Sequence, residues 1–375
     1  MSKFADQRSP TMNIRVTLGP VSRPLDTMRF VTIQAFEQKF SCRINSLPQN
    51  VCLMGWFKAE QRWYCAPEFL AHPQSTRSGH VFHVGGRKQL LQFLSTRVLP
   101  TLNVPSIWFP YSFYDGWRER TIFSPQYRWV VPPDMSGWAE WRGSPGEIPI
   151  LSPSRPWLLC LGAHRGDPSA FVVPDSHYLQ QNHYVELFAE VKSHLVAWAD
   201  RKPRAILAAG DHGENANFFR PSDDSTLHPR RLFQRTVADQ GLAADVVLGQ
   251  NVSLADQLGY RYIVDVDGFA RTWTAWAWKM MSGATVLSVE SPWTAFFTDQ
   301  FSPWEHFVPV ANDCSDLAEK LDWCRANDAE CQAIAGRAQQ QATRVYEINA
   351  VAERVVTRLR ERLDTPMPAD WAENL

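Results

Sequence analysis

The stretch YRYIVDVDG, residues 260–268, places two aspartates one residue apart immediately before a glycine. Successive side chains of a strand point to opposite faces, so we expect Asp265 and Asp267 to lie together on one face at the carboxyl end of a strand. The other face is apolar and comprises Tyr260, Tyr262, Val264 and Val266. Paired carboxylates suit a divalent cation on a nucleotide diphosphate, but they equally suit hydrogen bonds from the amides of the next loop.

The residues that follow, GFARTWT, combine a glycine, a guanidinium and two hydroxyls. We expect a tight turn at Gly268 and a helix whose first turn contains Arg271, Thr272 and Thr274. Free amides at the start of a helix, its positive dipole end and a planar guanidinium together describe a diphosphate site. The alternative makes Thr272 a helix N-cap and Arg271 a surface cation.

The elements that must position these residues alternate along the second half of the chain. Helical patterns in HYVELFAEVKSHLVAWA and HPRRLFQRTVADQ alternate with the apolar runs RAILAAG, ADVVLG, RYIVDVDG and ATVLSV. This alternation predicts an α/β fold with a doubly wound parallel sheet. Ligands of such sheets bind beyond the carboxyl ends of the strands.

The first half is less regular. We expect strands in HVFHVGG and VPSIWFPYSF around a helix in RKQLLQFLSTRVL, followed by long loops rich in Pro, Gly and Ser over residues 130–156. A second lobe should begin near residues 165–180. We therefore divide the chain into a first lobe (1–170), a second lobe (171–345) and a helical tail (346–375). Residues 328–363 are helical in character but too long for one ordinary helix, so we expect a break there.

Composition narrows the partners. The chain has 375 residues, 38 of them basic and 39 acidic, which leaves no basic field for nucleic acid. The start has no secretory pattern, and no run of 18 uncharged apolar residues occurs, so we expect a soluble, non-exported protein. The seven cysteines lack metal-finger spacing and are expected to be buried free thiols.

A longer stretch carries a resemblance. The blocks YRYIVDVDG, KMMSGATVL, ESPWTAFF, PWEHFVPV and DLAEKLDWCRAND follow one another in the order of glycosyltransferase family 90. Weaker matches in HRGDPSAFVVPD, WADRKPRAILAAGD and HPRRLF extend the resemblance to roughly residues 160–345. The family includes protein O-glucosyltransferases, capsule-associated xylosyltransferases and bacterial enzymes of surface-glycan and lipopolysaccharide synthesis.

The resemblance implies a GT-B-like fold, in which two Rossmann-like lobes flank a cleft and C-terminal helices follow. It makes residues 1–170 the acceptor-side lobe and residues 171–345 the nucleotide-sugar-binding lobe. It also implies inverting transfer from a nucleotide diphosphate sugar without a bound metal, with no cofactor besides the UDP-sugar co-substrate. On this interpretation helix dipoles and cationic side chains neutralise the leaving diphosphate. Asp265 and Asp267 then bind loop amides or a sugar hydroxyl.

The chain departs from the family pattern at two positions. Ala209 stands where many members have a phosphate-binding arginine, and Thr274 stands where many eukaryotic members have another. Arg271 is the obvious substitute cation. The further donor-site candidates are Arg230, Arg231, Asp211 and His212, together with Glu290 for the ribose hydroxyls. Trp293 and Phe296 either pack the base or sugar or belong to the core.

The family also implies an aspartate that deprotonates the acceptor hydroxyl. The segment VLPTLNVPSIWFPYSFYDGW points to Asp115, although its spacing requires an insertion, so Asp134 and Asp175 stay open. Asp115 and Asp134 also read as ordinary turn residues.

Taken together, we expect a cytoplasmic glycosyltransferase acting on a surface-glycan or lipopolysaccharide-type acceptor, with peripheral contact to the inner membrane where that acceptor is membrane-borne. Two other classes stay open, a nucleotide-sugar or glycan-binding protein without activity and, more remotely, a glycoside hydrolase with paired carboxylates. The sugar, the acceptor and its linkage, and the oligomeric state are not readable from the sequence.

Overall fold

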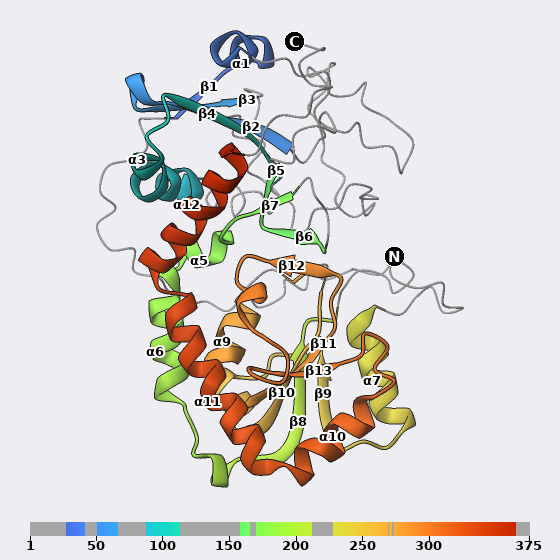
Figure 1. The fold of residues 1–375 in the computed structure, drawn as a ribbon. Helices are drawn as coiled ribbons and strands as arrows, with labels where there is room; N and C mark the ends of the chain where they lie inside the picture. Colours follow the sequence, from blue (N-terminus) through green and yellow to red (C-terminus); the bar gives the residue numbers. More distant parts are fainter. Residues whose placement is uncertain are drawn as a thin grey trace, which may run out of the picture.

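The computed structural model describes residues 28–41, 51–66, 88–112, 158–165, 170–211, 228–268, 270–271 and 274–364. These residues form two α/β lobes stacked one above the other, with the C-terminal helices running along one side of both (Figure 1). Both lobes and the C-terminal helices were expected from the sequence, and this fold class is confirmed. The predicted divisions at residues 170 and 345 stay a prediction.

The first lobe contains a six-stranded mixed sheet in the order β1-β3-β2-β4-β5-β7. Strand β2 is antiparallel to β3 and β4, whereas β5 is parallel to β4 and β7. Its strands are β1 (Met28–Phe30), β2 (Val51–Phe57), β3 (Arg62–Ala66), β4 (Ser106–Ser112), β5 (Leu158–Cys160) and β7 (Ala170–Val172). Strand β4 matches the predicted VPSIWFPYSF strand, while β1, β2 and β3 were not predicted. The predicted HVFHVGG strand and the loops over residues 130–156 lie outside the described residues.

Helical segments cover this sheet. Helix α1 (Ile33–Phe40) begins at Thr32, whose hydroxyl accepts a hydrogen bond from the amide of Ala35. Residues 88–93 are helical and continue through a π-helical turn η4 (Leu94–Val98) into α3 (Leu99–Leu102), which confirms the predicted RKQLLQFLSTRVL helix. The remaining described segments before the second sheet are η1 (Lys58–Glu60), α5 (Ser176–Gln180), η6 (Asn182–Tyr184) and η7 (Trp198–Asp200).

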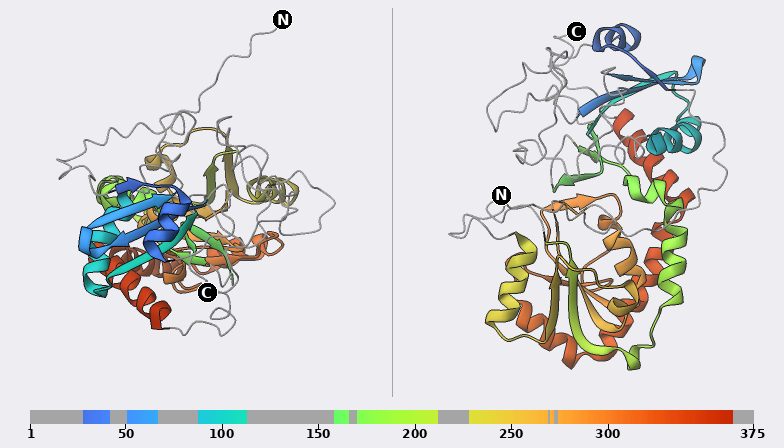
Figure 2. Two further views of the ribbon diagram at one scale, coloured as in Figure 1. Left: turned by 90° about the horizontal axis from the view of Figure 1, so that it is seen from above. Right: turned by 180° about the vertical axis from the view of Figure 1, so that it is seen from behind.

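The second lobe contains the predicted parallel sheet, in the order β13-β11-β10-β8-β9. Its strands are β8 (Lys202–Ala209), β9 (Ala244–Leu248), β10 (Tyr260–Asp265), β11 (Thr285–Val289) and β13 (Val308–Val310). Its helices are α6 (Val185–Ser193), α7 (Pro229–Asp239), α8 (Leu254–Leu258), α9 (Ala275–Met281), α10 (Leu317–Ala326) and α11 (Asp328–Val345), with η9 (Thr298–Gln300) before β13. Figure 2 shows helices on both faces of this sheet.

Two local expectations for this lobe were wrong. Tyr260 packs with a different apolar cluster from Tyr262 and Val264, and the pairing of β10 with β8 shifts register between residues 260 and 262. Helix α9 begins only at Ala275, after Thr274. Arg271 therefore lies in the loop before the helix and not in its first turn.

The two lobes are joined in two ways. Strand β6 (Gly162–His164) of the first lobe pairs antiparallel with β12 (Trp293–Ala295) of the second. Helix α12 (Ile348–Asp364) follows α11 after a break at residues 346–347, as predicted, and runs back beside the first lobe (Figures 1 and 2).

One apolar core fills the space between the lobes along the α12 side. It includes Phe109 of β4, Tyr178 of α5, Met280 of α9 and Val355 of α12, all buried. A second cluster lies on the other face of the parallel sheet. Six of the seven cysteines lie in the described residues, and all six are buried free thiols as predicted. Because the lobes share a core, residues at their junction are held in fixed relative positions.

Candidate donor site at the carboxyl edge of the second sheet

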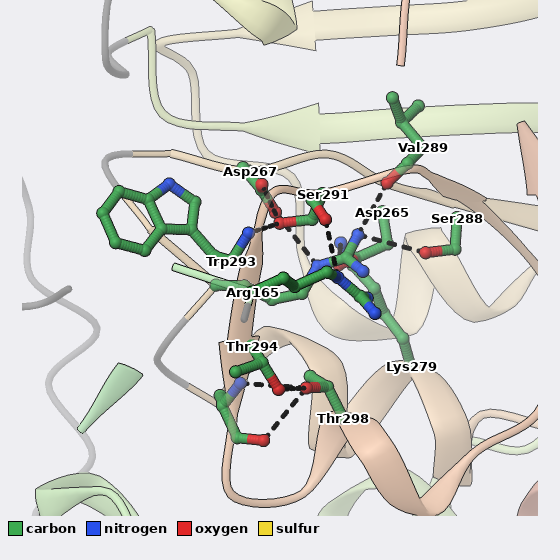
Figure 3. A network of polar contacts seen from close by, with 12 residues as sticks. Arg165, Asp265, Asp267, Lys279, Ser288, Val289, Ser291, Trp293, Thr294 and Thr298 are labelled. Carbon is green, nitrogen blue, oxygen red and sulfur yellow. Dashed lines mark hydrogen bonds and ion pairs between the residues drawn. The ribbon is translucent and has the colours of Figure 1, made fainter. Parts of the chain in front are cut away.

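The loops that follow β8, β10 and β11 leave the parallel sheet at its carboxyl edge. Parallel strands end at the same edge, so these loops meet there. Asp265, Asp267 and Ser291 lie together at this edge, and Arg165, which follows β6 of the first lobe, donates to the carbonyl of Ser291 (Figure 3). Asp211 follows β8 and pairs with Arg231.

Asp265 lies at the end of β10 and is held between two cations. Its Oδ1 is 2.8 Å from Nζ of Lys279 on α9, and its Oδ2 is 3.0 Å from Nη2 of Arg271. Burial works against the charge of this carboxylate, but Lys279 and Arg271 outweigh burial and hold the pKa of Asp265 below its usual value. Asp265 is therefore an ionised, internally neutralised carboxylate.

Asp267 is buried with fewer compensating charges. Its Oδ1 accepts from Nε of Arg271 at 3.0 Å, and its Oδ2 accepts a hydrogen bond from the hydroxyl of Ser291. Burial raises the pKa of Asp267 above its usual value despite Arg271, and the nearby charge of Asp265 adds to the rise. The two aspartates thus share one strand face, as predicted, but have opposite pKa shifts.

Arg271 is the centre of this cluster and only 8% exposed. Besides the two aspartates it donates through Nη2 to the hydroxyl of Ser288 at 3.0 Å and to the carbonyl of Val289 at 2.9 Å, and its guanidinium lies 5.1 Å from the ring of Trp276. Within the described residues its Nη1 makes no hydrogen bond. Arg271 therefore holds the two aspartates and the end of β11 together, and its Nη1 is the nitrogen left for a ligand.

Arg230 approaches the same cluster from α7. Its Nη1 donates to the carbonyl of Gly210 at 2.8 Å, and burial lowers its pKa while the charges of Asp265 and Asp267 raise it. A Cβ placed on Gly268 would lie 2.9 Å from Nη2 of Arg230. Gly268 does not have a positive φ, so this position favours glycine through space for the guanidinium and not through the predicted tight turn.

Arg231 forms a more exposed pair with Asp211. Its Nε donates to Oδ1 of Asp211 at 2.7 Å and its Nη2 contacts the other carboxylate oxygen. The hydrogen bonds from Arg231 lower the pKa of Asp211, and His228 lies 3.2 Å from the same carboxylate. Arg231 and Asp211 therefore largely neutralise each other, whereas Arg230 points toward the buried cluster.

Other sequence-predicted residues are placed as follows. Thr274 is the N-cap residue of α9 but makes no side-chain capping bond. The side chain of Glu290 is exposed, while its amide donates to Val310 at 2.8 Å. Trp293 and Phe296 are 2% and 1% exposed, which favours the core over a stacking platform for either ring.

Of the candidate bases, the structure describes Asp175 alone. Its carboxylate caps α5 by accepting from the amide of Tyr178 at 2.9 Å and from the hydroxyl of Tyr184 at 3.0 Å. This is a structural role, because the carboxylate is 7% exposed and surrounded by core side chains. Asp115, Asp134, Thr272 and His212 lie outside the described residues.

Three residues of the cluster were missed in the sequence. Lys279 is a lone charge in the otherwise apolar helix AWAWKMM, which was a usable signal for a buried ion pair. Ser291 directly follows the strand-end residue Glu290. Arg165 had no signal, because its position depends on the pairing of β6 with β12.

Comparison with known proteins identifies the domain that carries this cluster. Residues 185–361 match the profile described as glycosyl transferase family 90. The chain contains a glycosyl transferase family 90 domain. Asp265, Asp267, Arg271, Lys279 and Ser291 all lie inside this range.

Similarity to curated proteins covers part of this chain and part of each relative. Protein O-glucosyltransferase 3 of Rattus norvegicus is 32% identical over 124 residues, which cover 32% of this chain and 24% of that protein. Protein O-glucosyltransferase 1 of the same species is 35% identical over 91 residues, covering 24% of this chain and 23% of that protein. Uncharacterized protein 035R of Invertebrate iridescent virus 3 is 34% identical over 110 residues, covering 29% and 10%. The chain thus spans a quarter or less of the length of these relatives.

Solved structures show distant overall similarity. A glycosyltransferase from Rickettsia africae aligns over 78% of this chain and 84% of that chain with a TM-score of 0.32 and 10% identity. Anabaena HepE in complex with UDP-glucose aligns over 47% of this chain and 45% of that chain with a TM-score of 0.28 and 12% identity.

The described residues contain no helix with the length and apolar character needed to cross a bilayer. They also contain no group of three or more His, Cys, Asp or Glu side chains arranged to hold a metal ion.

Proposed function

We propose that this protein is an inverting, metal-independent glycosyltransferase that moves a sugar from a UDP-linked donor to a hydroxyl of a surface-glycan or lipopolysaccharide-type acceptor. The observation that carries the proposal is the cationic, hydrogen-bonded cluster at the carboxyl edge of the parallel sheet inside the family 90 domain. This edge is where doubly wound sheets bind nucleotides. The named relatives with protein O-glucosyltransferase activity support the same reaction class.

The charges of the cluster fit an anionic donor. Arg230, Arg271 and Lys279 supply three cationic side chains, against the two carboxyl groups of Asp265 and Asp267. We propose that Nη1 of Arg271 and the guanidinium of Arg230 contact the diphosphate. The loop around Gly268 and Thr274 would lie against the phosphates, Arg231, Asp211 and His212 would form its outer rim, and Glu290 would bind the ribose hydroxyls.

The state of the two carboxylates supports a reaction without a divalent cation. A metal needs hard oxygen ligands that are free to coordinate it. The carboxylate oxygens of Asp265 and Asp267 already accept from Arg271, Lys279 and Ser291, so a metal would have to displace buried cations. We propose that these cations do the electrostatic work on the leaving group.

In the proposed reaction the acceptor oxygen bonds to the anomeric carbon of the donor sugar as the bond from that carbon to the diphosphate oxygen breaks. The hydroxyl proton passes to a carboxylate, for which Asp115 is the proposed base. The diphosphate leaves as UDP, and inversion follows from attack on the face opposite to the leaving group.

A panel of nucleotide sugars tests the proposal. A donor at 100 times its dissociation constant should raise the free energy of unfolding by about 2.7 kcal/mol, which thermal unfolding detects readily. The donor that stabilises the protein is then offered with glycan acceptors, and products are followed by mass spectrometry. Stabilisation without any transfer would favour the nucleotide-sugar-binding alternative, which the alanine at position 209 motivates. A protein that no nucleoside diphosphate stabilises would refute both.

A further inference from the structure

The paired strands β6 and β12, called the strap below, join the two lobes. They bring an exposed arginine to the candidate donor site. Arg165 immediately follows β6, and its amide donates to the carbonyl of Pro292 at 2.7 Å. Its Nε donates to the carbonyl of Ser291 at 2.8 Å, as drawn in Figure 3. The backbone and the first nitrogen of the guanidinium are therefore both fixed against the second lobe.

A short chain of hydrogen bonds links Arg165 to the buried cluster. The residue that accepts from its Nε, Ser291, donates through its hydroxyl to Asp267, and Asp267 accepts in turn from Arg271. Arg165 is thus the outermost cation of the network that contains Arg271. Arg271 is almost fully buried, whereas the side chain of Arg165 is exposed.

The charge of Arg165 is not compensated within the part of the chain that the structure describes. Neither carboxylate of the cluster contacts it, and the bonds it makes go to main-chain carbonyls. Adding it to Arg230, Arg271 and Lys279 gives four positive charges against the two aspartates, a net charge of +2. Counting the exposed Glu290 beside Ser291 leaves +1, so the edge keeps an excess of positive charge at the junction.

We infer that Arg165 binds the diphosphate of the nucleotide-sugar donor from the first lobe, using the two Nη nitrogens that its bond to Ser291 leaves available. A planar guanidinium can hold phosphate oxygens in a bidentate manner, and fixing its Nε in advance reduces the entropy lost on binding. The ligand class comes from the proposed function, and the excess positive charge among the described residues would attract the diphosphate of that donor. This inference rests on the proposed function.

The consequence is a donor site built from both lobes. Arg230 and Arg271 would contact the diphosphate from the second lobe and Arg165 from the first. Since β6 and β12 are paired, Arg165 would be in place before the donor arrives and would need no closure of the lobes to reach it.

The test compares UDP with uridine, because a diphosphate contact distinguishes these ligands and a general packing defect does not. With the full-length protein, UDP affinity is measured by calorimetry and uridine binding by ligand-observed NMR. Arg165→Ala should weaken UDP binding by about tenfold to a hundredfold, the range expected for charge-assisted hydrogen bonds, and leave uridine binding unchanged. Arg165→Lys should recover part of the UDP affinity. The matched control is Arg325→Ala, an exposed arginine paired with Asp322 on α10.

Two results would overturn the inference while the proposed function stands. One is parental UDP affinity in Arg165→Ala, and the other is an equal loss for UDP and uridine, which would mean that Arg165 only supports the junction. If the alanine variant does not fold, Arg165→Gln replaces it, because the amide can still donate to Ser291 while the charge is gone. A parent protein that binds no UDP would refute the proposed function and this inference with it.

Discussion

Replacing Arg271 by alanine tests whether this residue organises the site from within. The change removes the guanidinium that contacts Asp265, Asp267, Ser288 and the carbonyl of Val289. Removing one partner of a buried ion pair typically costs about 3–5 kcal/mol, because the remaining charge is left buried. Asp265 keeps Lys279 in the variant, so the stranded charge is that of Asp267. We expect a loss of about 3–4 kcal/mol in the free energy of unfolding.

The assay is urea and thermal unfolding of the parent, Arg271→Ala and the double variant Arg271→Ala/Asp267→Asn. At roughly 3 °C per kcal/mol for a lobe of this size, the single variant should melt about 10 °C below the parent. The double variant should recover about 1–3 kcal/mol, because the asparagine carries no charge to strand. Arg204→Ala, at an exposed pair with Asp245, should cost less than about 1 kcal/mol.

The pH dependence of the same variants gives an independent check. The pKa of Asp267 is raised in the native state, so its contribution to stability is present below the usual aspartate value and is lost as pH rises through the raised value. Losing Arg271 should raise this pKa further. The deficit of Arg271→Ala should therefore be largest above the raised pKa of Asp267 and shrink as the pH is lowered through that pKa toward the usual aspartate value.

These measurements can refute the reasoning directly. If Arg271→Ala unfolds within about 1 kcal/mol of the parent but loses UDP affinity, Arg271 serves the ligand and not the fold. If the double variant is no more stable than Arg271→Ala, Asp267 is not the stranded charge. UDP affinity of Arg271→Ala must be measured well below its melting temperature, where loss of the Nη1 contact should still weaken binding.

Three further outcomes follow from the proposed reaction. Asp115→Asn should lower turnover by about 10²- to 10⁴-fold with donor affinity and melting temperature nearly unchanged, and normal turnover would move the base to Asp134. Transfer should persist in EDTA, and a complete loss that manganese restores would show that a metal is required. Asp175→Ala should cost about 1–3 kcal/mol of stability by leaving Tyr178 and Tyr184 without their acceptor. The folded variant should turn over normally. A folded variant that is inactive would give Asp175 a role in the reaction.

The second lobe was readable from the sequence because each of its elements carries its own pattern. Alternating apolar runs and amphipathic helices predicted the parallel sheet, and the period of a strand predicted that Asp265 and Asp267 share a face. The expectations that were wrong concern features that depend on neighbouring strands and side chains. The register shift in β10 depends on β8, and the late start of α9 accompanies the inward turn of Arg271 toward two carboxylates.

The first lobe was harder to predict because its sheet is assembled from distant segments. Strand β5 lies beside β4 although 45 residues separate the end of one from the start of the other. The pairing of β6 with β12 joins residues about 130 apart in the sequence and has no local signal. The position of Arg165 depends on that pairing, so its sequence context alone could not indicate that it lies beside Ser291 at the carboxyl edge of the second sheet.

The location of the cations has a consequence for how the donor site is built. Ala209 ends β8 with a side chain that carries no charge, where the family pattern suggested a phosphate-binding arginine in the second lobe. Arg165 supplies a cation to the same edge from the first lobe. A cation held on the strap can contact the diphosphate only while β6 and β12 stay paired, so donor affinity in this chain should depend on the integrity of the junction. Ala163→Pro would disrupt β6, because it removes an amide from the pairing with Thr294. The UDP affinity of this variant should fall to about that of Arg165→Ala. The same change in Arg165→Ala should then weaken UDP binding little further, because the two changes remove the same contact.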